Sequence, residues 1–522
     1  MTSTHKTWGF QWTTVLSLTD GIALLVVAIG NYLLYLVGLR PSIQSLRHLP
    51  GPRATNYILG NAKEIMNEHS LWPVADSFPE PYISWMQQFG GAVYYRVLFE
   101  ERVQLTDPTA VHHVLHTQAA NFPRHPTVRF YLQDMAGGIG LLSSEDALHD
   151  RQRAALTSIL NTEQINNMLR VVHSQAQWYC STELATAAAF SSPMNMNTVF
   201  QELTLHTLGL VTCGVDFLAN PTAKHAYEEL QKHPSPMLMM IAMAIPGFTH
   251  LPLPSFERRK RARSALLKVV QDAIDAKRRN PSGNKRKDLM DAMLDAQIDA
   301  NEAAVHTLSM LLAGHDTMST SLCWALYMLS THPSAMAQVR AEYQAAMAKH
   351  GSLGEWSAVA ELPFLAAVIQ ETLRLHPVLP TLPRRVAAQD CHVPMVDGSD
   401  ILLQKGTPIV VVTSAMHRDP KYWKRARHFI PERFIAGTTA FDDDMNLRGG
   451  QSYARHFMPF GLGPKSCIGE RFALAALQLV VGTFVANFDF AVTRQANCRH
   501  KFDGLAVQPA HLEMSVRPRR TC

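Results

Sequence analysis

Cysteine is scarce in this sequence, and it never occurs in the close pairs that disulfide frameworks and zinc sites use. The 522-residue chain contains seven cysteines, and no two of them form a Cys-x-x-Cys motif. An odd number of scattered cysteines argues against a disulfide-stapled domain and against a structural zinc site, and it indicates a reducing compartment. A cysteine with a chemical role in this protein must therefore act alone.

Charge and repetition are also limited. Charged residues make up 17% of the chain, and the basic residues behind the net charge of +5 form short clusters without interleaved aromatic residues. This pattern argues against nucleic-acid binding and fits an acidic partner or an anionic membrane surface. The chain has no internal repeat or low-complexity tract, and its 47% hydrophobic residues suffice for a large core. Composition alone permits one large domain or several ordinary ones.

Residues 22–39 form an uncharged apolar run. As a helix this run would be roughly 27 Å long, which is enough to cross the core of a bilayer. No small-x-small cleavage site follows it, so a membrane anchor is favoured over a signal peptide. Arginines at 40, 47 and 53 follow the run, whereas only Lys6 precedes it, so the positive-inside rule places the rest of the chain in the cytosol. The sequence predicts an anchor segment over residues 1–45 and a large domain over residues 46–522.

Residues 460–469 place one cysteine in a tightly specified loop. Phe460 opens the loop, glycines stand at 461, 463 and 469, and Lys465 precedes Cys467 by two residues. Such glycines let the backbone come close to a flat ligand. Apolar residues then recur every four positions, at 472, 476, 480, 484 and 488, which predicts a helix that starts just after the cysteine.

The position of Cys467 at a predicted helix start suggests its chemistry. Unpaired N–H groups and the positive end of the helix dipole favour an anionic sulfur there. We therefore interpret Cys467 as a metal ligand. The alternative, from the residues alone, is a buried thiol in a turn before a core helix.

Residues 305–329 have the pattern of a long apolar helix, which the sequence Ala-Gly-His-Asp-Thr interrupts at 313–317. The polar groups in its middle argue against a second membrane span. Asp316 and Thr317 would destabilise an apolar helix unless they are paired or used, so function is expected to override propensity here. The alternative is a kinked helix with satisfied side chains.

Two further pairs of charged residues have helical spacing. His149 and Arg153 are four residues apart, and Glu371 and Arg374 are three apart, so each pair shares one helix face. Taken alone, either pair fits a solvated helix surface. Residues 236–254 are rich in methionine and bounded by prolines, a composition that suits a contact with apolar ligands or with a membrane and argues against one long helix.

In their order along the chain, these features resemble the cytochrome P-450 family of haem-thiolate monooxygenases, in its membrane-anchored microsomal form. The resemblance covers nearly the whole chain, including a Leu-Pro-Gly-Pro hinge at 49–52 and a Pro-Glu-Arg-Phe segment at 431–434. It implies a fold that is mainly α with small β-sheets, in which a single large haem-thiolate catalytic domain follows one N-terminal transmembrane helix. It also implies residence in the endoplasmic reticulum with the catalytic domain facing the cytosol.

The resemblance assigns roles to individual residues. Cys467 would be the axial thiolate ligand of haem b, and Phe460 would pack near its sulfur. Thr317 would hydrogen bond dioxygen, and Asp316 would deliver protons. Glu371, Arg374 and Arg433 would form a buried structural network. The residues expected to reach the haem propionates are Lys465, which stands where Arg is commoner, His149, which replaces the commoner Trp, Arg153, and either Arg384 or Arg385, of which we prefer Arg385.

The resemblance implies oxidation of a hydrophobic small molecule with O2, a terpenoid or other secondary metabolite first and a fatty acid second. The chain has no Gly-x-Gly-x-x-Gly motif and no length left for a flavin domain, so its electrons must come from a separate NADPH-dependent flavoprotein reductase. The basic residues that we expect to contact it are Lys421, Lys424, Arg425 and Lys465. The alternatives are a haem-thiolate isomerase or dehydratase that acts on a peroxide without external electrons, and a non-catalytic membrane protein that binds haem or lipid.

Overall fold

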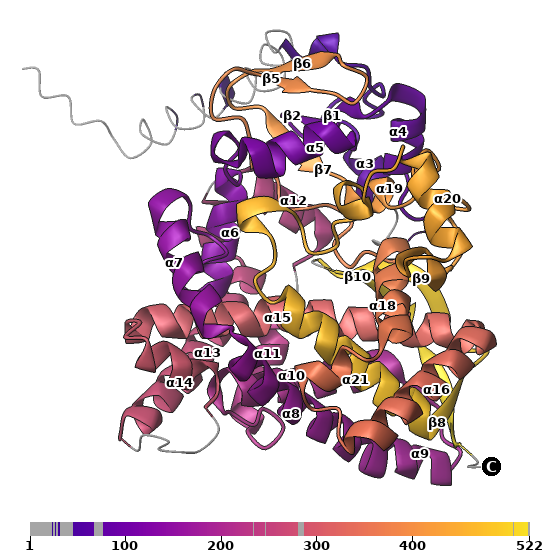
Figure 1. The fold of residues 1–522 in the computed structure, drawn as a ribbon. Helices are drawn as coiled ribbons and strands as arrows, with labels where there is room; N and C mark the ends of the chain where they lie inside the picture. Colours follow the sequence, from indigo (N-terminus) through magenta and orange to yellow (C-terminus); the bar gives the residue numbers. More distant parts are fainter. Residues whose placement is uncertain are drawn as a thin grey trace, which may run out of the picture.

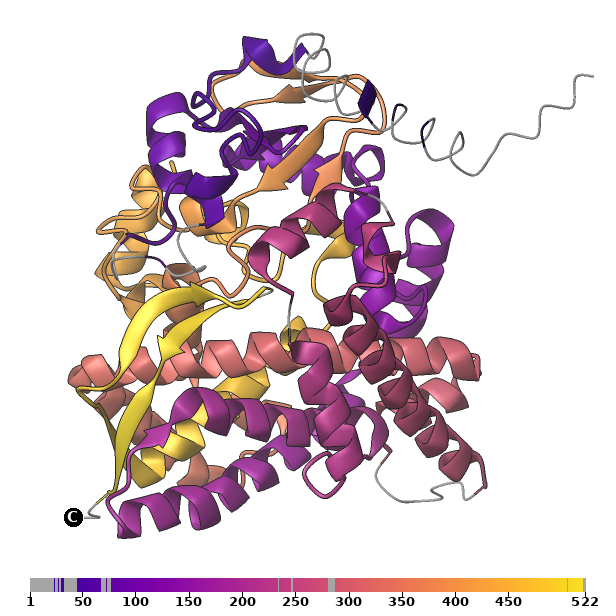
Figure 2. The same cartoon turned by 180° about the vertical axis from the view of Figure 1, so that it is seen from behind.

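A computed structural model (Figures 1 and 2) describes residues 45–66, 72, 77–232, 234–245, 247–279, 287–504 and 506–519, together with residues 23, 27, 30 and 31. The predicted membrane anchor at about 22–39 therefore lies almost wholly outside the described residues. Among the described residues, no helix is both long and apolar enough to cross a bilayer.

Helices dominate the described chain, as predicted. They are α3 (Ala62–Met66), α4 (Tyr82–Phe89), α5 (Pro108–His112), α6 (Pro126–Ala136), α7 (Asp146–Ile159), α8 (Thr162–Tyr179), α9 (Ala185–Ala189), α10 (Met196–Cys213), α11 (Pro221–Gln231), α12 (Pro236–Ala244), α13 (Pro254–Arg279), α14 (Leu289–Asp295), α15 (Ala300–Thr331), α16 (Pro333–His350), α17 (Trp356–Val359), α18 (Pro363–Leu375), α19 (Thr413–Met416), α20 (Thr439–Leu447) and α21 (Glu470–Asn487). The described chain also contains the short π-helix η5 (His113–Thr117) and the 3-10 turn η11 (Gly463–Lys465).

The sheets are small, which confirms the predicted fold class of mainly α with small β-sheets. The strands are β1 (Ala92–Val97), β2 (Glu100–Leu105), β3 (Met194–Asn195), β4 (Arg385–Val386), β5 (Cys391–Pro394), β6 (Asp400–Leu403), β7 (Pro408–Val411), β8 (Phe488–Val492), β9 (Asn497–Phe502), β10 (Val507–His511) and β11 (Glu513–Pro518). They form sheets in the orders β1-β2-β7-β4, β3-β11-β8, β10-β9 and β5-β6. In Figures 1 and 2 the sheet that contains β1 and β2 lies on one side of α15, and α8 and α10 lie on the other.

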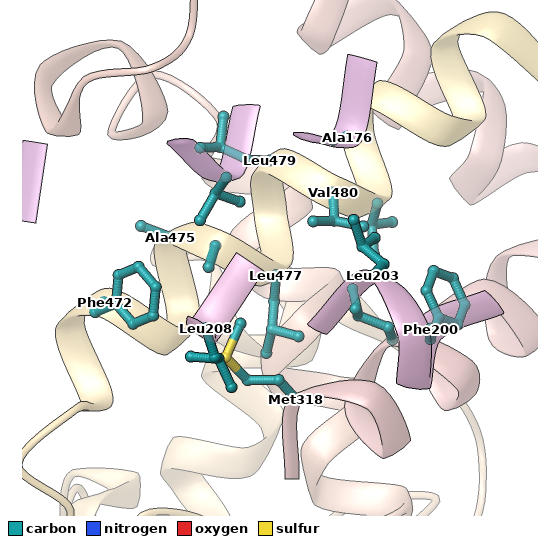
Figure 3. Close-up of a cluster of buried hydrophobic side chains, with 14 of the residues drawn as sticks. Ala176, Phe200, Leu203, Leu208, Met318, Phe472, Ala475, Leu477, Leu479 and Val480 are labelled. Carbon is teal, nitrogen blue, oxygen red and sulfur yellow. The ribbon is translucent and has the colours of Figure 1, made fainter. Parts of the chain in front are cut away.

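The long helix α15 is the centre of the main core. It spans the predicted residues 305–329 without a break, and Met318 packs among side chains of α10 and α21 such as Leu208 and Leu477 (Figure 3). Gly314 makes this packing possible, because a Cβ atom at that position would lie only 3.0 Å from the Leu208 side chain. The helix that carries the predicted oxygen-site residues is therefore held directly against the helix that follows Cys467.

The predicted apolar repeat after Cys467 is confirmed except at its last member. The side chains at 472, 476, 480 and 484 are buried in α21. Phe488 is also buried, but it begins strand β8, so the prediction that it belongs to the helix was wrong. A four-residue spacing cannot distinguish a helix from a buried strand that continues its apolar face.

The predicted network of Glu371, Arg374 and Arg433 is confirmed, and it is fully buried. Arg374 donates to both Glu371 carboxylate oxygens, at 2.6 and 2.7 Å, and Arg433 Nε donates to Oε1 at 3.0 Å. The structure adds Asp444, whose carboxylate pairs with the far side of Arg433. The guanidinium groups of Arg374 and Arg433 also lie 5.2 and 5.8 Å from the centre of the Trp423 ring. Two carboxylates thus balance two arginines in the interior.

Removing one buried charge from this network should strongly destabilise the folded protein. We expect Glu371→Gln to lower the free energy of unfolding by about 3–5 kcal/mol, because both arginines lose a charged partner in a dry environment. The control Asp443→Asn removes a half-exposed partner of Lys424 and should change it by less than about 1 kcal/mol. Urea denaturation of both variants measures the difference, and equal effects would contradict the assignment of a buried network.

Candidate active site

The loop around Cys467 is fixed by its own backbone. The Cys467 N–H donates to the carbonyl of Phe460 at 2.8 Å, which closes the loop on itself. Gly463 has a left-handed φ of +77°, and a Cβ atom there would lie 2.0 Å from the carbonyl oxygen of Leu115 in η5. Only glycine lets the loop rest this closely on η5. The sequence between Phe460 and Cys467 therefore specifies one loop shape.

Cys467 is reachable from solvent although much of the protein lies close to its sulfur. The residue is accessible to solvent, yet enough protein surrounds it for burial to raise the pKa of the thiol, an effect that the Gly469 N–H only partly offsets. Within the protein's own groups, desolvation raises the pKa of this thiol by more than the N–H of Gly469 at the helix start lowers it. A thiolate at this position needs a bound cation to stabilise it.

Two predicted propionate donors end in unpaired buried atoms. His149, on α7, bonds Asp150 through Nδ1 at 3.1 Å, while its buried Nε2 has no hydrogen-bond partner among the described residues. The same holds for Nε of Arg385 on β4, where burial and the neighbouring charge of Arg124 lower the pKa of the guanidinium to about 10. An unpaired buried donor costs about 1–3 kcal/mol, so the Nε–H of Arg385 calls for an acceptor that the described residues do not supply. His149 differs, because Nδ1–H donates to Asp150 and burial lowers the pKa of the ring, which leaves Nε2 of the neutral ring as an acceptor.

Arg384 is engaged elsewhere, which separates it from its neighbour Arg385. It pairs with the carboxylate of Glu100 and donates to the Thr127 hydroxyl at 3.0 Å and to the Met243 carbonyl at 2.7 Å. Its donors are thus occupied by protein acceptors. Of the two arginines, Arg385 is the one with a buried nitrogen left for a ligand.

Lys465 and Arg153 both have partners within the protein. Arg153 donates to the carbonyl of Ser466 at 2.6 Å, so it ties α7 to the cysteine loop. Lys465 pairs with the carboxylate of Glu145, and its side chain is only 9% exposed. The prediction that Lys465 belongs to a reductase-docking surface was therefore wrong.

Glu145 is a residue of this cluster that sequence reasoning missed. It lies directly before α7 and accepts hydrogen bonds from the backbone N–H of Arg124 at 3.1 Å and from its Nη1 at 3.3 Å. Burial raises the pKa of this carboxyl, but Lys465 and Arg124 lower it by more, so the net shift is downward. The sequence feature that could have indicated Glu145 is its position at the start of a predicted helix, four residues before His149.

The two predicted oxygen-site residues on α15 make different local contacts. The Thr317 hydroxyl donates to the carbonyl of Ala313 at 2.7 Å, one turn earlier. The carboxylate of Asp316 lies 2.9 Å from Nδ1 of His315, and both side chains are more than nine-tenths buried. Sequence reasoning treated His315 only as part of the motif, whereas the structure makes it the observed polar partner of Asp316.

The methionine-rich segment near α12 leaves apolar side chains on the surface. It forms the short helix α12 and a separate turn at Phe248–His250, which confirms that its prolines prevent one long helix. Met237, Ile245 and Leu251 are each more than 40% exposed. The backbone carbonyl of Met243 on α12 is held by Arg384, which connects this segment to the residue before β4.

Together these groups fit haem b. The accessible sulfur of Cys467 can ligate iron, and the unpaired Nε–H of Arg385 can donate to one of the two carboxylates that the cofactor carries. His149 can donate to the other carboxylate once its Nε2 carries a proton. The charges of His149, Arg385 and Lys465 influence one another's pKa values directly or through Arg124 and Glu145, so these side chains form one electrostatic cluster.

Comparisons with known proteins agree with this geometry. The model of the family described as Cytochrome P450 matches residues 50–516. Cytochrome P450 monooxygenase 205 of Postia placenta is 25% identical over 514 residues, which cover 90% of each chain. Cytochrome P450 3A5 of Homo sapiens is 25% identical over 505 residues, which cover 92% of this chain and 93% of that protein. The 11-hydroxysugiol 20-monooxygenase of Salvia miltiorrhiza is 32% identical over 259 residues, covering 47% of this chain and 48% of that enzyme.

The lowered pKa of Glu145 predicts a pH dependence of stability. A carboxyl whose pKa is depressed on folding stabilises the native state above its ordinary value of 4.5, and this contribution is lost as the pH falls through the folded-state pKa. We expect Glu145→Gln to lower the free energy of unfolding by about 3 kcal/mol at neutral pH, because Lys465 loses its buried partner, and to weaken the dependence below pH 4.5.

Urea denaturation at a series of pH values from neutral to acidic measures both effects. Glu163→Gln, which removes an exposed carboxyl from the first turn of α8, serves as the control and should keep the wild-type dependence. If the two variants have the same pH dependence, Glu145 does not carry the depressed pKa.

Proposed function

Because the chain belongs to the cytochrome P450 family, whose monooxygenases bind haem b through a cysteine thiolate, we propose that Cys467 is the axial ligand in this protein. The observation that carries this proposal is the accessible Cys467 sulfur in a backbone-fixed loop, with an unpaired buried donor at Arg385 Nε and an unpaired buried ring nitrogen at His149 Nε2. The protein is a P450 monooxygenase, which incorporates one oxygen atom from O2 into its substrate.

When bound, haem b supplies the oxygen activation that the protein's own side chains cannot. Cys467 would ligate the iron, and Phe460, whose carbonyl fixes the loop, would pack near the sulfur. Arg385 would neutralise a propionate, His149 would bind one once its Nε2 carries a proton, and Lys465, balanced by Glu145, would add a positive field. Arg153 acts through Ser466 and holds the loop against α7. The polar end of the site is therefore held by α7, β4 and the loop.

Asp316 and Thr317, on α15, would handle the protons that the reaction needs. The Thr317 hydroxyl exchanges its bond to the Ala313 carbonyl for a bond to dioxygen, which orients it. Asp316, buried beside His315, supplies the proton. These two residues favour monooxygenation over isomerisation of a peroxide, because the isomerisation needs no external protons or electrons. A strict requirement for NADPH and reductase would separate the two reactions.

Electrons come from a separate NADPH-dependent flavoprotein reductase. Lys421, Lys424 and Arg425 are exposed on the segment that follows His417, and the His417 ring accepts a hydrogen bond from Met458 beside the cysteine loop. This basic surface is connected through His417 and Met458 to the cysteine loop, and it suits an acidic face of the reductase. Long-range electrostatic attraction would orient the two proteins for docking.

The substrate is a hydrophobic small molecule, a terpenoid or other secondary metabolite first and a fatty acid second. The exposed apolar side chains around α12 support this, as does the similarity to a monooxygenase named for 11-hydroxysugiol.

Residues 22–39 anchor the protein in the endoplasmic reticulum membrane, with residues 46–522 in the cytosol. Membrane fractionation of chains with and without residues 1–45 tests this hypothesis.

The role of Cys467 can be checked by spectroscopy. We expect the reduced, carbon-monoxide-bound protein to show the Soret band of a thiolate ligand. Cys467→Ala should lose this band, because no sulfur remains at this position to ligate the iron. Cys498→Ala, which removes another partly buried cysteine, should leave the band unchanged. A thiolate-type band that survives in Cys467→Ala would overturn the assignment.

The docking surface can be checked by charge reversal. We expect the double substitution Lys424→Glu and Arg425→Glu to slow the first electron transfer at least about tenfold at low salt, and less at high salt, because long-range attraction is screened. The control reverses two exposed charges on α13, Lys260→Glu and Arg261→Glu. Stopped-flow reduction under carbon monoxide measures the rates, and equal rates for wild type and the docking variant would exclude this surface.

A further inference from the structure

The side chain of His315 is held on both sides by oxygen acceptors. Its Nε2 lies 3.0 Å from the backbone carbonyl of Gln201 on α10, and its Nδ1 lies 2.9 Å from Oδ1 of Asp316. The side-chain amide of Gln231 on α11 approaches the same Nδ1 at 3.3 Å. Three helices therefore fix the position of this ring.

The two acceptors determine how many protons the pair must hold. A neutral imidazole carries one N–H and cannot donate to two oxygens at once. With Nε2–H donating to Gln201, the contact between Nδ1 and Asp316 also requires a proton, carried either by the ring beside a carboxylate or by Asp316. The first case requires the Gln231 amide to turn its oxygen toward Nδ1, because its nitrogen can only donate. In either case one proton is shared between His315 and Asp316.

The surroundings keep this proton where it is. The side chains of His315 and Asp316 are 6% and 9% exposed, and the edge of the Tyr227 ring closes the site, with ring centres 5.0 Å apart. The other titratable groups near Asp316 are Tyr227, which hydrogen bonds Gln231, and Tyr131, which faces Arg259. Both tyrosine hydroxyls have pKa values raised by burial, so neither competes for the proton at neutral pH.

Gln231 connects this buried pair to the surface. It is half-buried at the end of α11, and its amide reaches both the Tyr227 hydroxyl, at 2.9 Å, and the His315 ring. His315 is therefore one side chain away from water, whereas Asp316 reaches water only past His315 and Gln231 along the contacts seen here. Because the Gln231 amide carries no mobile proton, a proton consumed at Asp316 can be replaced only by water that reaches the His315 ring past Gln231.

We propose that His315 is a positioning residue that stores the proton which Asp316 delivers to the oxygen site. In this step the Nδ1–H bond of His315 breaks and an Oδ1–H bond forms on Asp316. The neutral ring keeps its Nε2–H bond to the Gln201 carbonyl, and a solvent proton then restores Nδ1–H. The proposal rests on the proposed function, since it assigns the proton supply of that same site.

Two substitutions separate proton storage from geometry. His315→Gln keeps an amide that can donate to Asp316 but cannot carry a mobile proton, and His315→Phe removes both properties. We expect both variants to lose at least about tenfold in product formed per NADPH consumed, with more peroxide released, and to show a larger solvent isotope effect on product formation. The control is His306→Gln, because His306 is another buried histidine of α15, set beside Glu302, and should behave as wild type.

A double-mutant cycle tests the pair without any turnover. If His315 and Asp316 share a proton, the stability losses of His315→Gln and Asp316→Asn, measured by urea unfolding, will not add in the double variant. Additive losses would overturn the pairing, and wild-type coupling with a wild-type isotope effect in His315→Gln would overturn proton storage. The thiolate Soret band should persist in all these variants; its absence from wild type would instead reject the proposed function.

Discussion

The buried ion pair of Glu371 and Arg374 is the interaction on which the cysteine loop depends. Arg374 uses its remaining donors to hold the backbone carbonyls of His417 and Ala426, at 2.8 and 2.7 Å. Burial and the charge of Arg374 lower the pKa of His417 to about 3, so its ring stays neutral and Nε2 accepts from the N–H of Met458 at 3.0 Å. Met458 lies two residues before Phe460, whose carbonyl closes the loop. A buried ion pair adds little stability compared with an apolar pair of the same size, although removing one partner is costly. This ion pair nevertheless determines where the sulfur lies.

Charge balance governs the polar end of the site in the same way. Arg124, Arg153, Arg385 and Lys465 bring four positive charges to one region, and Glu145 is the carboxylate that the chain places among them. The two carboxylates of the cofactor would add two negative charges, since the iron offsets the charge of the thiolate and the porphyrin ring, and with Glu145 this makes three. Four like charges without these anions would repel strongly in a poorly solvated region, so a binding site for an anionic ligand explains why they are clustered.

The sequence was informative wherever a function leaves a local pattern. The apolar periodicity predicted α15 and α21, and the spacing of Glu371 and Arg374 placed both on α18. What could not be predicted depends on residues that only the fold brings together. Glu145 and Lys465 are 320 positions apart, and nothing near Lys465 in the sequence indicates that Glu145 is its partner. The raised pKa of the Cys467 thiol was also beyond prediction, because a helix start is a local feature, whereas desolvation depends on everything packed around it.

The polar centre of α15 shows how function and packing are reconciled on one helix. The face that contains Gly314 and Met318 is small or apolar, and it packs tightly on α10 and α21. The polar side chains between them do not disrupt this core, because each has a partner: Thr317 bonds the carbonyl one turn back, and Asp316 and His315 bond each other. Both partnerships are reversible, since a hydroxyl can exchange acceptors and a shared proton can move. A helix with such contacts is stable at rest and can still release a proton without a change in its packing.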